Sequence, residues 1–373
     1  MNVFTFELKK IFFSKRFLWL TIILVIGILL LFLRNYMFQN EILKEGLREI
    51  DAQISKTQEN ARSHRIVLER VSDDEEEQQK EAINLEIRDQ LYNLVTNFEK
   101  NDWVQNLRLQ NDIWQKTISY REQGGEAMLS IEEMEENIAF NEELIRRGIA
   151  PEHAVYSIAS PNFTKQIMDI WIHGGALFLL LVVVGETMAV EFEQHSIKLL
   201  FTQPLSKKLV VLSKFGTALS TYIVLLIITF LTAGGISLVV GEKGSWNYPV
   251  MIANQDAIEF MSISSYMLKS VTMTSILVLF TIALLIFYSL YMKKIYPTFI
   301  ALIATFALGY AITSVMDWQV LRWFNPFINI WPSKTLLGAY SASWYGAIPV
   351  TLLLTVLIYL ASVQKMKKSY IES

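Results

Sequence analysis

The sequence contains no cysteine, which excludes a disulfide-bonded scaffold and a metal site built on thiolates. Histidine is also scarce, since only four occur among 373 residues. They are scattered along the chain and form no metal-binding or nucleophile pattern: His64, His153, His173 and His195. We therefore predict no metal site, and we interpret His173, beside two glycines, as a packed or interfacial side chain.

Motifs that carry covalent chemistry are equally absent from the sequence. There is no G-x-x-x-x-G-K-[ST] phosphate-binding loop, no H-E-x-x-H and no G-x-S-x-G. The acidic run SDDEEEQQ, from residue 72 to 79, lacks the glycine and the alternating ligands of a calcium loop, and it suits a helix N-terminus better. We therefore predict that the chain is not an enzyme, holds no cofactor and binds no nucleic acid.

Long apolar runs are present instead, and their distribution is more informative than the overall 52% of hydrophobic residues. A helix needs about 20 mainly apolar residues to cross the hydrocarbon core of a bilayer. Six windows meet this need: 17–34, 168–190, 209–240, 265–292, 296–316 and 346–363. The pattern predicts an all-α membrane protein with six transmembrane helices and with a first span that is an uncleaved anchor.

Positive charge predicts the orientation of these spans, because lysine and arginine collect on the cytoplasmic side. With six spans, four basic groups fall on one side: Lys9 to Arg16, Lys198 to Lys214, Lys293 with Lys294, and Lys365 to Lys368. Tryptophans gather on the other side, as in an interfacial aromatic belt: Trp171, Trp246, Trp318, Trp323, Trp331 and Trp344. We therefore expect both termini to be cytoplasmic.

This topology divides the chain into residues 1–34, 35–165 and 166–373. The middle part should be an extracellular domain, and it holds 15 Lys and Arg against 26 Asp and Glu, a net charge of −11. One-sided apolar stripes predict three to five helices there: Leu43, Leu47, Ile50 and Ile54; Ile83, Ile87, Leu91, Leu94 and Phe98; Trp103, Leu107, Trp114 and Ile118. Capping boxes are expected at Ser72 and Ser130, and Gly148 should end the last helix. This domain is either a solvated stalk or a receptor for cationic ligands.

A half-polar stretch, EFEQHSIKLLFTQPLSKK, lies between the second and third spans. Its apolar and charged residues alternate up to Pro204, which predicts a short amphipathic helix over residues 191–204. By composition alone, such a helix could simply lie on the lipid surface.

The same stretch closely resembles the coupling-helix region of ABC-2-type (type V) transporter permeases. The matching residues are Gly185, Glu186, Glu191, Phe192, Glu193, Ile197, Lys198, Leu199, Leu200, Pro204, Ser206, Ser213, Lys214 and Phe215. That family often has Gly-Thr where this chain has His195-Ser196. The first residues, MNVFTFELKKIFFSKRFL, resemble the family's interfacial elbow helix, and residues 317–345 resemble its outer re-entrant hairpin.

The resemblance implies a permease subunit whose coupling helix docks into a separate cytoplasmic ATPase, which would bind ATP and magnesium. It assigns ATPase coupling to Glu191, Phe192, Glu193, His195, Ser196, Ile197, Lys198, Leu199 and Leu200. A second permease chain, identical or paralogous, and membrane lipids are the other expected partners. The large insertion between spans one and two is not part of the resemblance.

Three charged residues near span ends are candidates for a transport pathway: Asp169, Glu186 and Lys269. Structural pairing or snorkelling to the interface is the alternative for each of them. As a whole, the sequence predicts an ABC exporter permease for an amphiphile, such as an antimicrobial peptide, an antibiotic or a lipid-like molecule, in a bacterial plasma membrane. The alternative is a non-transporting sensor or scaffold that binds external ligands or wall material through its extracellular helices.

Overall fold

The computed structural model describes residues 3–71, 73–98, 102–185, 188–197, 206–254, 257–315, 324–338 and 343–369. Six helices in it are long and apolar enough to cross a membrane: Lys15–Met37, Ser160–Glu193, Lys207–Val239, Ile263–Met292, Ile295–Thr313 and Ile348–Lys368. The all-α membrane class and the six predicted spans are confirmed. Each span overlaps its predicted window, and the largest difference is the second span, which begins eight residues earlier than expected.

The second span is broken near its middle. It comprises α7 (Ser160–Ile170), a π-helical turn η1 (Trp171–Gly175), α8 (Ala176–Val184) and, after a gap at 186–187, α9 (Ala189–Glu193). Gly174 has φ 114°, a left-handed value that side chains with a Cβ rarely adopt, and His173 is also non-helical. The kink is therefore built on the Gly174 position, where the backbone leaves the α-helical path.

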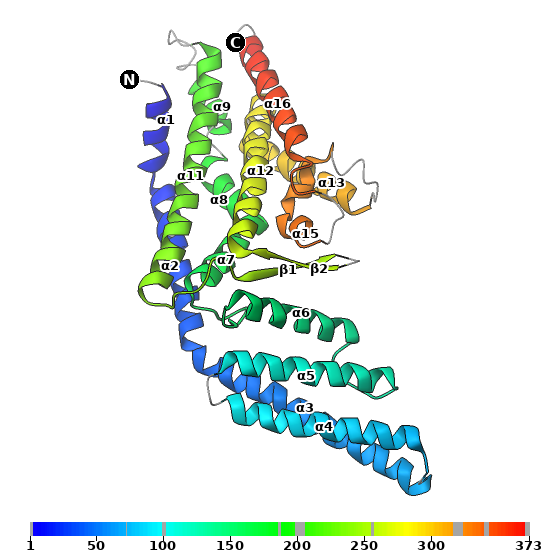
Figure 1. Cartoon of the computed structure of the whole chain (residues 1–373). Helices are drawn as coiled ribbons and strands as arrows, with labels where there is room; N and C mark the ends of the chain where they lie inside the picture. The colour runs from blue at the N-terminus through cyan, green and yellow to red at the C-terminus, as the bar shows by residue number, and fades with distance from the viewer. Residues whose placement is uncertain are drawn as a thin grey trace.

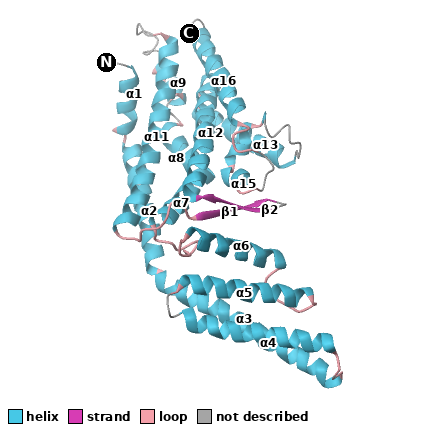
Figure 2. Cartoon of the chain, viewed as in Figure 1, coloured by secondary structure: helices cyan, strands magenta, loops and turns pink. Residues whose placement is uncertain are grey.

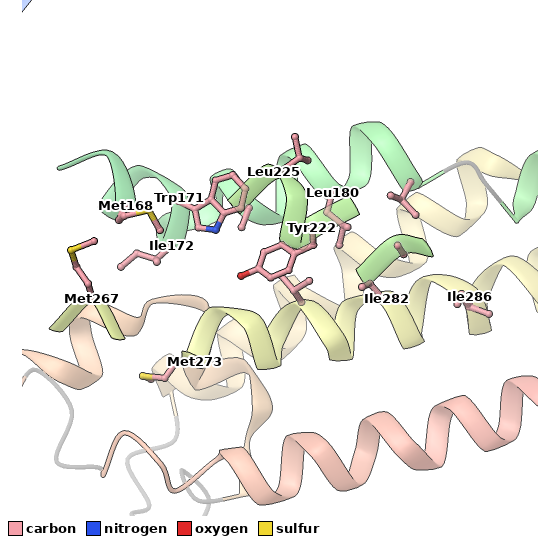
Figure 3. Close-up of a cluster of buried hydrophobic side chains, with 14 of the residues drawn as sticks. Met168, Trp171, Ile172, Leu180, Tyr222, Leu225, Met267, Met273, Ile282 and Ile286 are labelled. Atoms are coloured by element: carbon pink, nitrogen blue, oxygen red, sulfur yellow. The ribbon is translucent and has the colours of Figure 1, made fainter. Parts of the chain in front are cut away.

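The spans pack around α12 (Ile263–Met292), whose apolar window is 67% buried. Its neighbours are α11 (Lys207–Val239), α16 (Ile348–Ser369) and α13 (Ile295–Val315). Figure 3 shows the core that α7, η1 and α8 share with α11 and α12. At its centre, the rings of Trp171 and Tyr222 lie 5.9 Å apart, and the Tyr222 hydroxyl is 2.8 Å from the Ser275 hydroxyl.

Four helices fill the predicted inserted domain, within the expected number. They are α3 (Gln39–Arg70), α4 (Glu75–Phe98), α5 (Trp103–Glu122) and α6 (Ile131–Arg147), and they lie in tiers across the end of the spans (Figure 1). A core shared by α3, α4 and α5 contains Ile50, Ile54, Ile87, Leu91, Leu94, Ile113 and Tyr120, whereas Leu144 of α6 packs in the core of the spans. Leu43, which the predicted stripe included, is instead 52% exposed.

Two of the predicted helix ends in this domain are confirmed. Ser130 and Glu133 form a reciprocal capping box at the start of α6, and Gly148 ends α6 with φ 66°. The box predicted at Ser72 lies outside the described residues.

A two-stranded hairpin lies between the spans and α6 (Figure 2), and the sequence analysis did not predict it. Strands β1 (Pro249–Asn254) and β2 (Ala257–Ser262) are antiparallel, with Val250 opposite Met261 and Ile252 opposite Glu259. The hairpin region rests on α6, where the Phe140 ring is 6.1 Å from Tyr248 and 6.2 Å from Phe260. The hairpin thus adds a packing contact to the two places where the chain itself joins the domain to the spans, from α2 (Lys15–Met37) into α3 and from α6 into α7.

The two ends of the bundle differ clearly. Both chain termini, α1 (Val3–Phe12) and the start of α11 lie at the end opposite α3 to α6 (Figure 1). Between α13 and α16, the described residues form η2 (Pro326–Ile330) and α15 (Pro332–Leu336). These two short helices are part of the predicted outer hairpin, while 316–323 and 339–342 lie outside the described residues.

Candidate functional site

A cluster of buried charges joins three helices near the end that carries both termini. Lys214 on α11 is only 3% exposed. Its ammonium Nζ lies 2.6 Å from the Glu191 carboxylate on α9 and 3.1 Å from the Glu7 carboxylate on α1. Lys10 on α1, which is half-exposed, lies 3.2 Å from the same Glu191 oxygen. The cluster therefore connects α1, α9 and α11.

Burial explains why these contacts matter for the position of α9. A buried charge must be paired, because the cost of removing it from water is several kcal/mol per ion. Glu7 and Glu191 are 3% and 6% exposed, so water does not offset the cost of burying either carboxylate. The second Glu191 oxygen, Oε2, is buried and has no hydrogen-bond partner among the described residues. Displacing α9 would therefore expose or unpair charge at three helices together.

The turn after α9 shows which predicted coupling residues face outward. Glu191 and Ile197 are buried and Phe192 is partly buried, whereas Glu193 and His195 are exposed. Ser196 donates a long hydrogen bond of 3.4 Å to the Glu191 carbonyl. The remaining predicted coupling residues, Lys198, Leu199 and Leu200, lie outside the described residues, so the predicted helix over 191–204 is described only through 197.

His195 occupies the position where the resembling family often has glycine. Its φ is 55°, in the left-handed region, and its N–H donates to the Phe192 carbonyl at 3.2 Å. Glycine adopts this conformation without steric cost, while histidine pays a small one. His195 thus has the left-handed backbone conformation that glycine would favour, and its imidazole is exposed.

The same segment also contacts α13. The Ile295 N–H at the start of α13 donates to the Glu193 carboxylate at 3.4 Å. A Cβ on Gly185 would lie 2.5 Å from the Phe299 ring of α13 and 2.3 Å from the Leu181 carbonyl oxygen, so only glycine fits there without a shift. Glu191 therefore ties this segment to α1 and α11, while Gly185 and Glu193 contact α13.

Comparison with protein families identifies this architecture. A family model described as "ABC-2 family transporter protein" matches residues 1–364, almost the whole chain. The chain belongs to this family. It is the membrane permease component of an ABC transporter, a multi-pass protein that works with an ATPase. Comparisons with curated proteins and with solved structures give no match.

Two of the candidate pathway residues of the permease, Asp169 and Lys269, have contacts that do not involve this cluster. Asp169 pairs with Lys165 at 2.7 Å and accepts a hydrogen bond from Tyr266 at 2.8 Å. The Lys269 ammonium lies 5.9 Å from the centre of the Trp344 ring. Glu186 lies outside the described residues. Asp169 and Lys269 thus have partners within the chain, and the pathway role remains a prediction.

His173 is also held within the permease, at the kink in the second span. Its Nδ1 is 2.6 Å from the Asp169 carbonyl, and its Nε2 is 2.5 Å from the Ser333 hydroxyl of α15. These contacts agree with the interpretation of His173 as a packed side chain.

Sequence reasoning did not single out Glu7 and Lys10 as partners of the polar segment. One signal was available, because Glu7 is the sole acidic residue in the first 40. A lone carboxylate in an interfacial helix rich in lysine suggests a specific partner. Its identity could not be read from the sequence, because Lys214 lies 207 positions away.

Proposed function

We propose that this permease belongs to an ATP-driven exporter and that residues 191–204 form the docking site for its ATPase. The observation that carries the proposal is the contact of Lys214 with both Glu191 and Glu7. A force applied to the exposed Glu193–His195 surface would pass through Glu191 to α11 and α1, and through Glu193 to α13. Closure of the ATPase dimer would thereby move several spans together, and this chain would catalyse no covalent step itself.

The assembly that we propose contains two permease chains, identical or paralogous, and two ATPase subunits. ATP and magnesium would be bound by the ATPase and not by this chain. The end that carries both termini would face the cytoplasm of a bacterium, with α3 to α6 outside the plasma membrane. The basic groups at that end and the net charge of −11 in residues 35–165 support this orientation.

The substrate that we propose is an amphiphile: a peptide, an antibiotic or a lipid-like molecule. An acidic domain attracts cationic groups by its long-range field, which favours substrates that carry positive charge. Surrounding lipids would cover the exposed apolar faces of α2 and α13, including Ile23 and Ile303.

Affinity purification from the native membrane in mild detergent, followed by mass spectrometry, tests this function directly. We expect a stoichiometric ATPase with a phosphate-binding loop. Glu193→Arg should reduce its recovery, because Glu193 is exposed in the proposed dock, while Glu135→Arg on exposed α6 provides the control at the opposite end. A folded permease that recovers an external partner and no ATPase would favour the sensor or scaffold interpretation.

A further inference from the structure

A second site, far from the charge cluster, lies where α2 continues into α3 (Figure 1). An apolar groove of about 490 Å³ runs between α2 and the kinked second span. Its walls include Ile23, Gly27 and Leu31 of α2, together with Ile170 and Leu179. This is a hydrocarbon-lined space open at the side of the bundle, suited to an acyl chain.

A polar hollow of about 530 Å³ adjoins the groove. Leu31, Arg34 and Ile170 line both spaces, so the two meet at the end of α2. The hollow extends beyond them toward Glu152, Asn162 and the start of the hairpin at Pro249. A ligand occupying both spaces would need an apolar chain and a polar head, in that order.

Apart from His153, whose Nε2 lies 3.6 Å from the Glu45 carboxylate, the charged residues that line the hollow form one neutral pair and two single charges. Lys165 and Asp169 neutralise each other at 2.7 Å. The Arg34 guanidinium donates to the Asn35 amide oxygen at 2.8 Å and to a backbone carbonyl at 3.3 Å, and it pairs with no carboxylate among the described residues. Arg34 is therefore a positioned cation whose charge is not neutralised locally.

Glu152 is the matching single anion. Its carboxylate accepts hydrogen bonds from the Ser157 hydroxyl and from the Asn162 amide, both at 2.5 Å. Both donors are neutral, and Glu152 pairs with no cation in the part of the chain that the structure describes. Hydrogen bonds from neutral groups fix the position of the carboxylate but do not neutralise its charge, so a cationic ligand group can pair with it.

The order of these charges selects the head group. Arg34 lies at the junction with the groove, while Glu152 lines only the polar hollow. A bound chain amphiphile therefore meets a positive charge first and a negative charge farther out. We propose that this site binds a zwitterionic amphiphile whose phosphate contacts Arg34 and whose primary amine contacts Glu152, as in a phosphoethanolamine lipid.

This site deepens the proposed function, because a bound amphiphile next to the kink would be a candidate substrate or a resident lipid. The binding itself is measured without ATPase or nucleotide, so that its failure leaves the exporter proposal untouched. Likewise, absence of an ATPase partner would leave the binding result intact.

The test is native mass spectrometry of the purified full-length permease titrated with three lipids of matched chains. Phosphatidylethanolamine carries both charges, phosphatidylglycerol lacks the amine, and phosphatidylcholine replaces it with a quaternary ammonium that cannot donate a hydrogen bond. We expect phosphatidylethanolamine to bind about tenfold more tightly than the other two, as one good charge-assisted contact allows.

Three variants separate the parts of the site. Arg34→Gln should weaken all three lipids alike, by about tenfold, because each of them carries the phosphate that Arg34 contacts. Glu152→Gln retains the shape and should weaken phosphatidylethanolamine only, removing its advantage over phosphatidylglycerol. Gly27→Phe should weaken all three lipids by filling the groove, since a Cβ at Gly27 meets nothing within 4 Å.

Arg65→Gln, an exposed arginine on α3, is the matched control and should change nothing. Thermal unfolding of each variant establishes that it is folded before binding is compared. Equal binding of the three lipids to the wild type, or a Glu152→Gln variant that keeps the full preference for the ethanolamine head group, would overturn the proposal and leave only ordinary annular lipid.

Discussion

The ammonium of Lys214 lies 2.6 Å from the carboxylate of Glu191, and both side chains are almost completely buried. Lys214 belongs to the third span, whereas Glu191 belongs to the short polar helix that precedes it. Such a pair is a poor source of net stability, since desolvation cancels most of the attraction. The pair instead fixes the position of α9, because breaking it deprives two buried charges of the nearer partner of each.

Replacing Lys214 with methionine should therefore destabilise the permease strongly. The change leaves Glu7 and Glu191 buried without their shared cation, and removing one partner of a buried pair costs about 3–5 kcal/mol. Thermal unfolding of the purified protein in detergent, followed by tryptophan fluorescence, measures the effect. Lys208→Met, at an exposed position on the same helix, is the control and should change the midpoint little.

The double variant Lys214→Met/Glu191→Met provides a sharper version of the same test. Removing both charges should cost less than the sum of the two single changes, by about 0.5–3 kcal/mol for residues in direct contact. Strict additivity would mean that the two side chains act independently, contrary to the geometry.

The backbone at His195 leads to a prediction about docking. Because its φ is 55°, His195→Gly should relieve local strain and preserve the turn, while His195→Val should disturb it by about 1–2 kcal/mol. We expect the glycine variant to retain ATPase recovery and the valine variant to lose it. Loss in both variants would show that the imidazole itself contacts the ATPase.

The absence of native cysteine makes the orientation directly testable. A single cysteine at Glu135 on α6 should react with a membrane-impermeant maleimide in intact cells. A single cysteine at Lys208 should react only after the membrane is opened. Both positions are exposed, so accessibility reflects the side of the membrane. The reverse labelling pattern would invert the topology and place the helical domain inside.

A buried hydrogen-bond chain in the helical domain predicts a pH effect. The Tyr120 hydroxyl lies 2.6 Å from His64 Nε2, and His64 Nδ1 lies 2.7 Å from the Glu77 carboxylate. Burial raises the pKa of Tyr120 from 10.0 to about 12, so the phenol remains protonated and donates to His64. The imidazole then donates from Nδ1 to Glu77.

Because the folded pKa of Tyr120 exceeds the unfolded one, the folded domain holds this proton more tightly. The contribution of this proton to the free energy of unfolding is complete below pH 10, and it is lost as the pH rises toward the folded pKa of about 12. Tyr120→Phe should lower the free energy of opening that protects the amides of α3 to α5 from hydrogen exchange. We expect a decrease of about 1–3 kcal/mol near pH 8, because His64 loses its hydrogen-bond donor. Hydrogen exchange of the full-length protein measures it, and exchange in α12 serves as the internal control.

Much of the fold was predictable because its main signals are local in sequence. A run of about twenty apolar residues is rare in soluble proteins, so the sequence predicts a membrane span there. Most predicted span ends lie within a few residues of the observed ones. The capping box at Ser130 and the stop at Gly148 are equally local. In the first predicted apolar stripe, Leu43 is the residue that is exposed and not buried. It lies near the first span, where an exposed leucine is common.

The features that escaped prediction depend on distant partners. Val250 and Ile252 alternate along β1, but a strand of six residues in the connection between two spans is easily mistaken for a loop. Gly174 and Gly175 stand next to each other in the sequence, but two adjacent glycines do not by themselves predict a π-helical turn. The candidate site was predicted as a surface segment, whereas the burial of Glu191 depends on Glu7, Lys10 and Lys214, which only the tertiary structure brings together.

The near-continuity of α2 and α3 has a mechanical consequence. The Phe38 N–H bonds to the Arg34 carbonyl, and the Ile42 N–H bonds back to the Phe38 carbonyl, so the two helices meet in a single tight turn. With 32 residues, α3 is about 48 Å long, and a tilt of about 10° at its base would displace its tip by about 8 Å. The first span and α3 thus form a lever, which converts a slight motion inside the bilayer into a large excursion at the far edge of the domain.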